Sequence, residues 1–204
     1  MSYQYNNTLL KNAKSLPLIC IPNRLLYDSS LPISEVNDEV RNVMLNMLYT
    51  MYLNSGIGLT AVQVGIMKKI IVIDIDRKNV PSEILNTSDE KEGRPIVHGG
   101  HPIFMANAEI LETNNENQVF YEGCLSIPEV GAHIERPSCV KVKYLDYSNN
   151  WRDEWFGPGL ISSCIQHEID HSNGILFWDH LSIIKREQLE NKSIRSIKLK
   201  NKKI

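Results

Sequence analysis

The segment Gln166–His171, QHEIDH, constrains this 204-residue chain more than any other feature. It contains the pattern H-E-x-x-H, and residues four apart share one face of a helix, so His167 and His171 can reach the same metal ion. Glu168 then projects near the open position of that ion, where it can accept a proton from water. The segment therefore predicts a helix that ends at Gly174 and carries a catalytic metal site, with a chance match as the alternative.

The order of the other expected elements indicates an α+β fold. Apolar residues recur at three- and four-residue steps over 35–53, which predicts an amphipathic helix. We expect mostly antiparallel strands wrapped around the central H-E-x-x-H helix, with a helix at each end, in a single domain spanning 1–204. The expected strands cover 69–76, 103–112, 119–122, 140–147 and 151–156. The remaining segments are an irregular N-terminus (1–17), a surface insertion (77–102) and a basic C-terminal helix or tail (183–204).

Composition excludes several classes of protein. Hydrophobic residues make up 42% and charged residues 23%, which is unlike collagen, coiled coils or disordered chains. Apolar runs fall far short of the roughly 20 residues that span a bilayer. The N-terminus has no cationic start before an apolar core, so we expect a cytoplasmic protein rather than a secreted one. Four widely spaced cysteines then indicate free thiols or a metal ligand rather than a disulfide framework.

Two histidines do not complete a catalytic site, because such sites usually have three protein ligands and a water. The histidine that metzincins carry six residues after the second one is absent, since Phe177 stands there. Glu187 or Glu190 would complete an H-E-x-x-H metallopeptidase, although both lie in a basic helix that looks solvated. The thiolate of Cys124 is the other candidate, because this residue follows a short strand and a glycine that permits a tight turn. The alternative for Cys124 is burial as a small apolar side chain.

Three motifs, in order, resemble those of bacterial-type peptide deformylases. The family patterns are G-φ-G-L-A-A-x-Q (φ apolar), E-G-C-L-S and Q-H-E-x-D-H, found here at Gly56–Gln63, Glu122–Ser126 and Gln166–His171. Flanking segments such as KIIVID, SIPEV and GILFWDHLS extend the likeness from about Leu18 to about Arg186. The chain is most similar to the branch with a C-terminal helix that is common in Gram-negative bacteria.

The resemblance implies a metalloenzyme acting on N-formylmethionyl peptides. Cys124, His167 and His171 would hold one divalent metal ion per chain, Fe(II) in the cell and Zn, Ni or Co in a purified protein. The implied reaction removes the N-formyl group from the N-terminal formylmethionine of nascent polypeptides and releases formate.

The resemblance also implies a role for each catalytic residue. Metal-bound hydroxide attacks the formyl carbon, and Glu168 serves as general base and then acid. The side chain of Gln63 and the backbone N–H of Leu125 would stabilise the oxyanion. The alternative for Gln63 is a loop-capping side chain. Asp170 would support its neighbours rather than take part in the chemistry.

The methionine side chain requires an apolar pocket beside the metal. Leu160, Cys164 and the two histidines share one stripe of the motif helix. By resemblance, the substrate-binding residues are Ile57, Gly58, Gly123, Leu160, Ser163 and Cys164.

The chain departs from the family pattern at a few positions. Thr60 stands where the family usually has Ala, which adds a hydroxyl near the active-site strand. Gly131 stands where many members carry Arg or another side chain that contacts the substrate. His98 and His101 form a loose pair in the insertion, which we interpret as loop decoration rather than a metal site.

The net charge of −2 is an average over two unlike parts of the chain. Residues 185–204 hold 8 Lys+Arg and 2 Asp+Glu, a charge of +6, while the rest of the chain holds 14 and 22, a charge of −8. A solvated face is one explanation for the basic segment. The other is a contact with ribosomal RNA near the exit tunnel. That contact would use Lys192, Arg195, Lys198, Lys200, Lys202 and Lys203.

Overall fold

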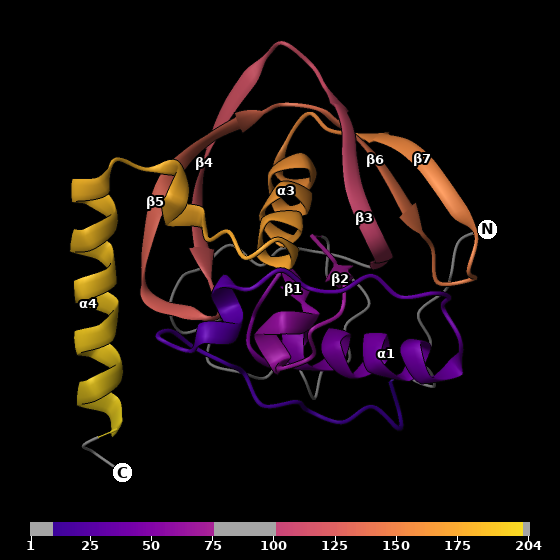
Figure 1. Cartoon of the computed structure of the whole chain (residues 1–204), viewed down its shortest axis with the longest axis horizontal. Helices are drawn as coiled ribbons and strands as arrows, with labels where there is room; N and C mark the ends of the chain where they lie inside the picture. Colours follow the sequence, from indigo (N-terminus) through magenta and orange to yellow (C-terminus); the bar gives the residue numbers. More distant parts are fainter. Residues whose placement is uncertain (1–9, 76–100, 202–204) are drawn as a thin grey trace.

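The computed structural model describes residues 10–75 and 101–201. Within these residues, three α-helices and seven strands make up the regular structure, together with short 3₁₀ turns (Figure 1). The helices are α1 (Asp38–Leu53), α3 (Leu160–Ser172) and α4 (Ile183–Asn201). The strands are β1 (Gly58–Thr60), β2 (Ile70–Ile73), β3 (Ile103–Thr113), β4 (Asn117–Cys124), β5 (Ile127–Pro137), β6 (Val140–Leu145) and β7 (Trp151–Phe156).

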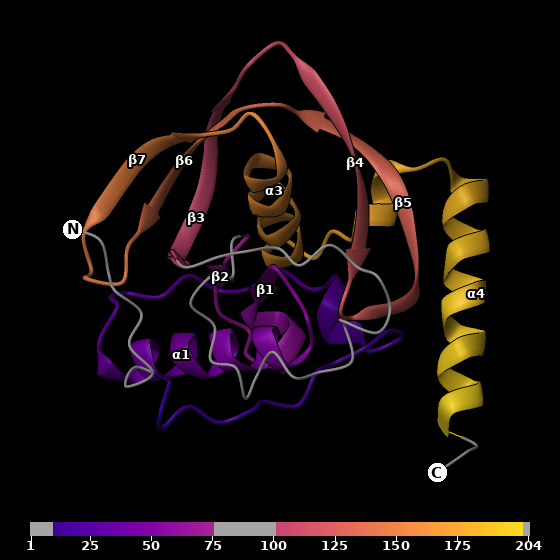
Figure 2. The same cartoon turned by 180° about the vertical axis from the view of Figure 1, so that it is seen from behind.

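The strands form two antiparallel sheets around α3. One sheet has the order β1-β2-β3-β6-β7, and the other consists of β4 and β5. Figures 1 and 2 show α3 in the space between the two sheets, with α1 beneath and α4 on the outer side of β5. This arrangement confirms the expected α+β class with a central H-E-x-x-H helix.

Strand β2 shows how the sequence pattern produces the layers. All four residues of its IIVI sequence are buried, because each face of the strand meets a different helix. Ile70 and Val72 join the cluster around α1, whereas Ile71 and Ile73 join the cluster around α3. The five-stranded sheet is therefore packed on both faces at β2.

The α-helices begin and end close to where the sequence predicted. Helix α1 begins three residues later than the expected position 35, because the Asn37 side chain accepts from the backbone N–H of Val40 at 3.1 Å and caps the first turn. Helix α3 ends at Ser172, and Gly174 follows it in the left-handed conformation with φ +74°. The four expected strands from 103 to 156 are present with small shifts at their ends.

The expected elements do not include β5, the strand that pairs with β4. Its sequence, IPEVGAHIERP, has a proline near each end and a glycine in the middle, which obscures the alternation of a strand. Pairing with β4 and packing against α4 stabilise it: Ile127 and Ile134 are buried in a third cluster with Trp178. The 3₁₀ turn Phe177–His180 was not predicted either.

Helix α4 lies against β5 through one apolar side. Leu189, Ile194 and Ile197 pack on the third cluster, and the Ser193 hydroxyl donates to the Pro128 carbonyl at 2.7 Å. The basic C-terminal segment is thus a docked helix as far as Asn201.

Several expectations concern other parts of the chain. The insertion at 77–102, apart from its last two residues, and residues 1–9 and 202–204 lie outside the described residues, as does His98. His101 is described and exposed. All four cysteines are free thiols, as expected. None of the described helices has the length and apolar character needed to cross a membrane.

Candidate metal and catalytic site

Helix α3 and the end of β4 bring three metal-ligating side chains together. His167 and His171 are one turn apart on α3 and both are buried. Cys124 is the last residue of β4, and the register with β5 shifts between Gly123 and Cys124. The Cys124 Sγ lies 3.1 Å from His171 Nε2, and the ligand atoms of all three residues lie within 4.8 Å of one another. One sulfur and two imidazole nitrogens at this spacing fit a divalent transition metal.

This cluster identifies Cys124 as the candidate third ligand. Glu187 and Glu190, the alternatives from sequence, lie on α4 outside β5 (Figure 1). Among the residues that the structure describes, Cys124, His167 and His171 are the group of three that could hold an ion.

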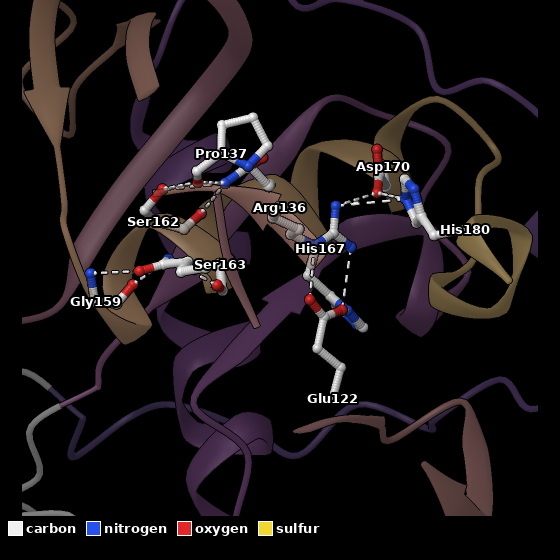
Figure 3. A network of polar contacts seen from close by, with 11 residues as sticks. Glu122, Arg136, Pro137, Gly159, Ser162, Ser163, His167, Asp170 and His180 are labelled. Carbon is white, nitrogen blue, oxygen red and sulfur yellow. Dashed lines mark hydrogen bonds and ion pairs between the residues drawn. The ribbon is translucent and has the colours of Figure 1, made fainter. Parts of the chain in front are cut away.

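A chain of polar contacts extends from His167 through buried Glu122 and Arg136 to half-buried Asp170 and exposed His180 (Figure 3). His167 Nδ1 is 2.9 Å from Glu122 Oε2, which leaves Nε2 to face the other ligands. Arg136 binds both oxygens of Glu122, at 2.6 and 3.0 Å, and also donates to Asp170 at 2.8 Å. The Asp170 carboxylate in turn lies 2.7 Å from His180 Nε2.

These contacts change the acidity of Glu122 and His167 in the metal-free protein. Burial raises the pKa of Glu122, but its bonds with His167 and Arg136 outweigh burial and lower that pKa to about 2. Burial lowers the pKa of His167, yet its bonds with Cys124 and Glu122 bring that pKa well above its usual value. His171 has no such carboxylate: burial, His167 and Arg136 all lower its pKa. The two histidines therefore have different protonation behaviour until a metal occupies the site.

Sequence reasoning assigned no role to Glu122, Arg136 or His180. Glu122 lies in the second motif and Arg136 in the ERP segment, so the sequence offered both residues as candidates for a role. Their contact depends on the β4–β5 register and on α3, which places His167, 45 residues along the chain, beside Glu122. Asp170 occupies the supporting position that was expected for it.

Glu168 occupies a buried slot between α3 and β1. Its side chain is 3% exposed, and its Oε2 accepts from the Thr60 hydroxyl at 2.7 Å. Gly58 lies against the other oxygen, since a Cβ built there would overlap Glu168 Oε1 and approach Cys164 Sγ to 2.8 Å. Burial raises the pKa of Glu168 above its ordinary value, although His167 and the Thr60 hydroxyl act in the opposite direction. A raised pKa suits a group that both accepts and releases a proton.

Gln63 has a fixed orientation beside the ligands. Its Oε1 accepts from the backbone N–H of Thr60 at 2.8 Å, so its Nε2 is the atom that faces the cluster. That amide nitrogen donates to Ser126 Oγ at 3.2 Å and lies 3.4 Å from Cys124 Sγ. The Gln63 side chain thus caps the local loop, which was the alternative considered for it, and it also directs an N–H donor toward the ligand cluster.

A cavity of about 740 Å³ opens onto Glu168 and His167. All six residues expected to bind substrate line it, as do the expected oxyanion donors Gln63 and Leu125. Cys164 is a wall of this cavity, and burial raises the pKa of its thiol well above the usual value, so it is suited to neither ligation nor nucleophilic attack. The six lining residues are Ile57, Gly58, Gly123, Leu160, Ser163 and Cys164.

Gly131 has a local reason to lack a side chain. A Cβ at this position would lie 2.6 Å from the Glu122 carbonyl oxygen and 2.7 Å from the ring of Tyr121. Tyr121 lines the cavity and also meets His133 edge-on, with ring centroids 5.3 Å apart. The Tyr121 ring therefore lies where a side chain at position 131, which we expect in many family members, would begin.

Comparisons with known proteins identify the family of this chain. A profile of the polypeptide deformylase family matches residues 15–187. A curated peptide deformylase of Pelagibacter ubique is 42% identical over 171 residues, which is 84% of this chain and 88% of that protein. The crystal structure of a peptide deformylase from Ehrlichia chaffeensis has 32% identity and a TM-score of 0.77, and the match covers 92% of this chain and 99% of that one. A Met-Ala-Ser-bound peptide deformylase of Acinetobacter baumannii has 28% identity and a TM-score of 0.69, over 83% and 99% of the two chains. The chain therefore belongs to the peptide deformylase family, whose members are metal-binding hydrolases.

Proposed function

We propose that this chain hydrolyses the N-formyl group of the N-terminal formylmethionine of nascent polypeptides and releases formate. The observation that carries the proposal is the cluster of Cys124, His167 and His171, because Cys124 and His167 line the same cavity as buried Glu168. The formyl group is a small planar amide, and the cavity places a proton acceptor and amide donors next to the ligand cluster. Because nascent chains are made in the cytoplasm, an enzyme that acts on them would be cytoplasmic.

Cys124, His167 and His171 are the residues that would hold the metal. When bound, the ion supplies Lewis acidity, which makes water more acidic and polarises a carbonyl oxygen. We propose Fe(II) as the ion in the cell, with Zn, Ni or Co acceptable in the purified protein, because sulfur and imidazole donors suit all of these. Metal analysis of anaerobically purified protein tests this choice. Faster inactivation of the iron form than of the nickel form in air would support it, because an iron-bound thiolate is prone to oxidation.

Glu168 is the proton carrier of the proposed reaction. Its carboxylate lies next to the ligand cluster and is shielded from bulk water, so it can take a proton from the attacking water. The same group then delivers the proton to the departing amine. Burial raises the pKa of this carboxyl, which favours its role as a proton acceptor.

Gln63 and Leu125 would stabilise the negative charge that develops on the formyl oxygen. The Gln63 amide is held by Thr60 before substrate binds, so no reorganisation is needed. Loss of one such donor typically lowers kcat by roughly 10²–10³. Gln63→Leu should therefore reduce kcat by about that factor.

The substrate would enter as an extended peptide. Its methionine side chain fits among Ile57, Leu160 and Cys164, with Ser163 at the same wall. Gly58 and Gly123 would leave the backbone accessible for hydrogen bonds with the peptide. The product-like tripeptide in the Acinetobacter enzyme supports this class of substrate.

Formate release from formyl-Met-Ala-Ser by the anaerobically purified, iron-loaded protein tests the reaction. Cys124→Ala should lose both metal and activity, whereas Cys139→Ala, in a turn away from the cavity, should keep both. Glu168→Gln should keep the metal and lose formate release. Absence of formate from the loaded wild type, or an active Cys124→Ala protein, would contradict the proposal and favour an H-E-x-x-H peptidase.

We also propose that α4 holds the enzyme near the ribosomal exit tunnel. Lys192, Arg195 and Lys198 are exposed on this helix, opposite the side that packs on β5. Replacing all three with Glu should weaken ribosome binding, most clearly at low salt, and leave turnover of formyl-Met-Ala-Ser unchanged. Unchanged ribosome binding would discard this partner.

A further inference from the structure

Thr60, the last residue of β1, makes a buried contact with the side chain of Glu168. Thr60 is fully buried, and its Oγ1 lies 2.7 Å from Glu168 Oε2 and 2.9 Å from the backbone oxygen of the same residue. Both oxygens that can accept the single hydrogen of this hydroxyl thus belong to Glu168. The buried Thr60 hydroxyl therefore forms a hydrogen bond with the proposed proton carrier, in addition to packing in the core.

The contact closes a slot around the carboxylate. The Thr60 hydroxyl bonds Oε2 on one side, and the bare backbone of Gly58 lies against Oε1 on the other. A glutamate side chain has three rotatable bonds, so an unsupported carboxylate can adopt several orientations. With Oε2 held by Thr60, the orientation of Oε1 is set as well.

A hydroxyl suits this place because it can both donate and accept. It donates to the carboxylate, a bond that the negative charge strengthens. It can instead turn to donate to the Glu168 backbone oxygen while accepting from the carboxyl group that holds the transferred proton. The contact therefore persists through the proposed cycle.

Thr60 also connects Glu168 with Gln63. Its backbone N–H holds the Gln63 amide at 2.8 Å, while its side chain holds the carboxylate. The bond to Gln63 needs only a backbone N–H, which every residue except proline has, whereas the bond to Glu168 needs a hydroxyl. Replacing the Thr60 side chain should therefore alter Glu168 and leave the Gln63 contact in place.

We propose that the Thr60 hydroxyl is a positioning group that holds the Glu168 carboxylate in the orientation needed for proton transfer. This inference rests on the proposed function, in which Glu168 carries the proton. It predicts an effect on kcat rather than on KM, because the hydroxyl touches Glu168 and lies outside the residues that line the cavity.

Two variants of Thr60 separate the hydroxyl from the shape of the side chain. Thr60→Val keeps the volume and removes the hydroxyl, and Thr60→Ser keeps the hydroxyl. We expect Thr60→Val to lower kcat roughly tenfold, a part of the 10²–10⁴ that acid–base catalysis supplies, with KM within about twofold and the metal content unchanged. Thr60→Ser should restore kcat to within about threefold of the wild type. Crystal structures should show one Glu168 conformer in the wild type and more than one in Thr60→Val.

Thr50→Val is the matched control. Thr50 is equally buried and its hydroxyl is also bonded, to Asn46 and Leu16, but it lies on α1 outside the cavity. This variant should lose stability and keep kcat per folded, metal-loaded molecule.

The outcomes are distinguishable. A wild-type kcat in Thr60→Val, or equal losses in Thr60→Val and Thr60→Ser, would overturn the positioning role. A change in KM alone would also overturn it. If Glu168→Gln itself retains formate release, the proposed function of Glu168 fails. If Glu168→Gln is inactive and Thr60→Val is unaffected, only the inference about Thr60 fails.

Discussion

Replacing Glu122 with Gln should destabilise the metal-free protein in a way that depends on pH. The ordinary pKa of this carboxyl is 4.5, and its bonds with His167 and Arg136 lower it to about 2 in the folded protein. A difference of about 2.5 pH units corresponds to about 3 kcal/mol, at roughly 1.4 kcal/mol per unit. Domains of this size have total stabilities of about 5–15 kcal/mol, so the effect is large.

The sign follows from the lowered pKa. A carboxylate with a depressed folded-state pKa contributes its full stabilisation above about pH 4.5, and the contribution is lost as the pH falls toward 2. Glu122→Gln should therefore cost about 3 kcal/mol at pH 7 and about half of that at pH 3. Urea unfolding of the chelator-treated wild type and variant, followed by tryptophan fluorescence, measures the difference at each pH.

Glu112→Gln is the control for this experiment. Glu112 pairs with Lys141 at 3.1 Å, but its side chain is 59% exposed, so its removal should leave the free energy of unfolding nearly unchanged. A cost for Glu122→Gln below about 1 kcal/mol at pH 7, or the same cost at pH 7 and pH 3, would refute the reasoning from the buried charges.

Three further substitutions test the packing around the site. Gly58→Ala should lower kcat by roughly 10² while the protein stays folded, because the new Cβ displaces the Glu168 carboxylate; a near-normal rate of formate release would contradict this. Gly131→Ala should reduce the free energy of unfolding by about 1–3 kcal/mol, since its Cβ would overlap the β4 backbone and the Tyr121 ring, and an unchanged urea midpoint would argue against that crowding. Ser193→Ala should cost about 1 kcal/mol in urea unfolding, because a buried bond to β5 is lost, and should leave the turnover of short peptides intact.

Local patterns were sufficient to predict most elements near the site. The helical period of α1 and the H-E-x-x-H spacing of α3 depend on side chains within a few residues of each other, so periodicity detects them. Strand β5 was missed for the opposite reason: Pro128, Gly131 and Pro137 interrupt its pattern, and pairing with β4 stabilises it. Its absence from the prediction also concealed the place of Arg136.

The sequence by itself was sufficient to identify the family and to propose the ligand types and the proton carrier, because these residues lie in short motifs with fixed spacing. The sequence also showed that Thr60 and Gly131 depart from the family pattern, but it did not show which side chains they contact. The tertiary structure brings Cys124, rather than Glu187 or Glu190, close to the histidines, as the family resemblance implied. Only the tertiary structure placed the Thr60 hydroxyl on Glu168, 108 residues away in the chain. The physical reason is the same in both cases: contacts between distant segments depend on strand register and helix packing, and no local pattern encodes them.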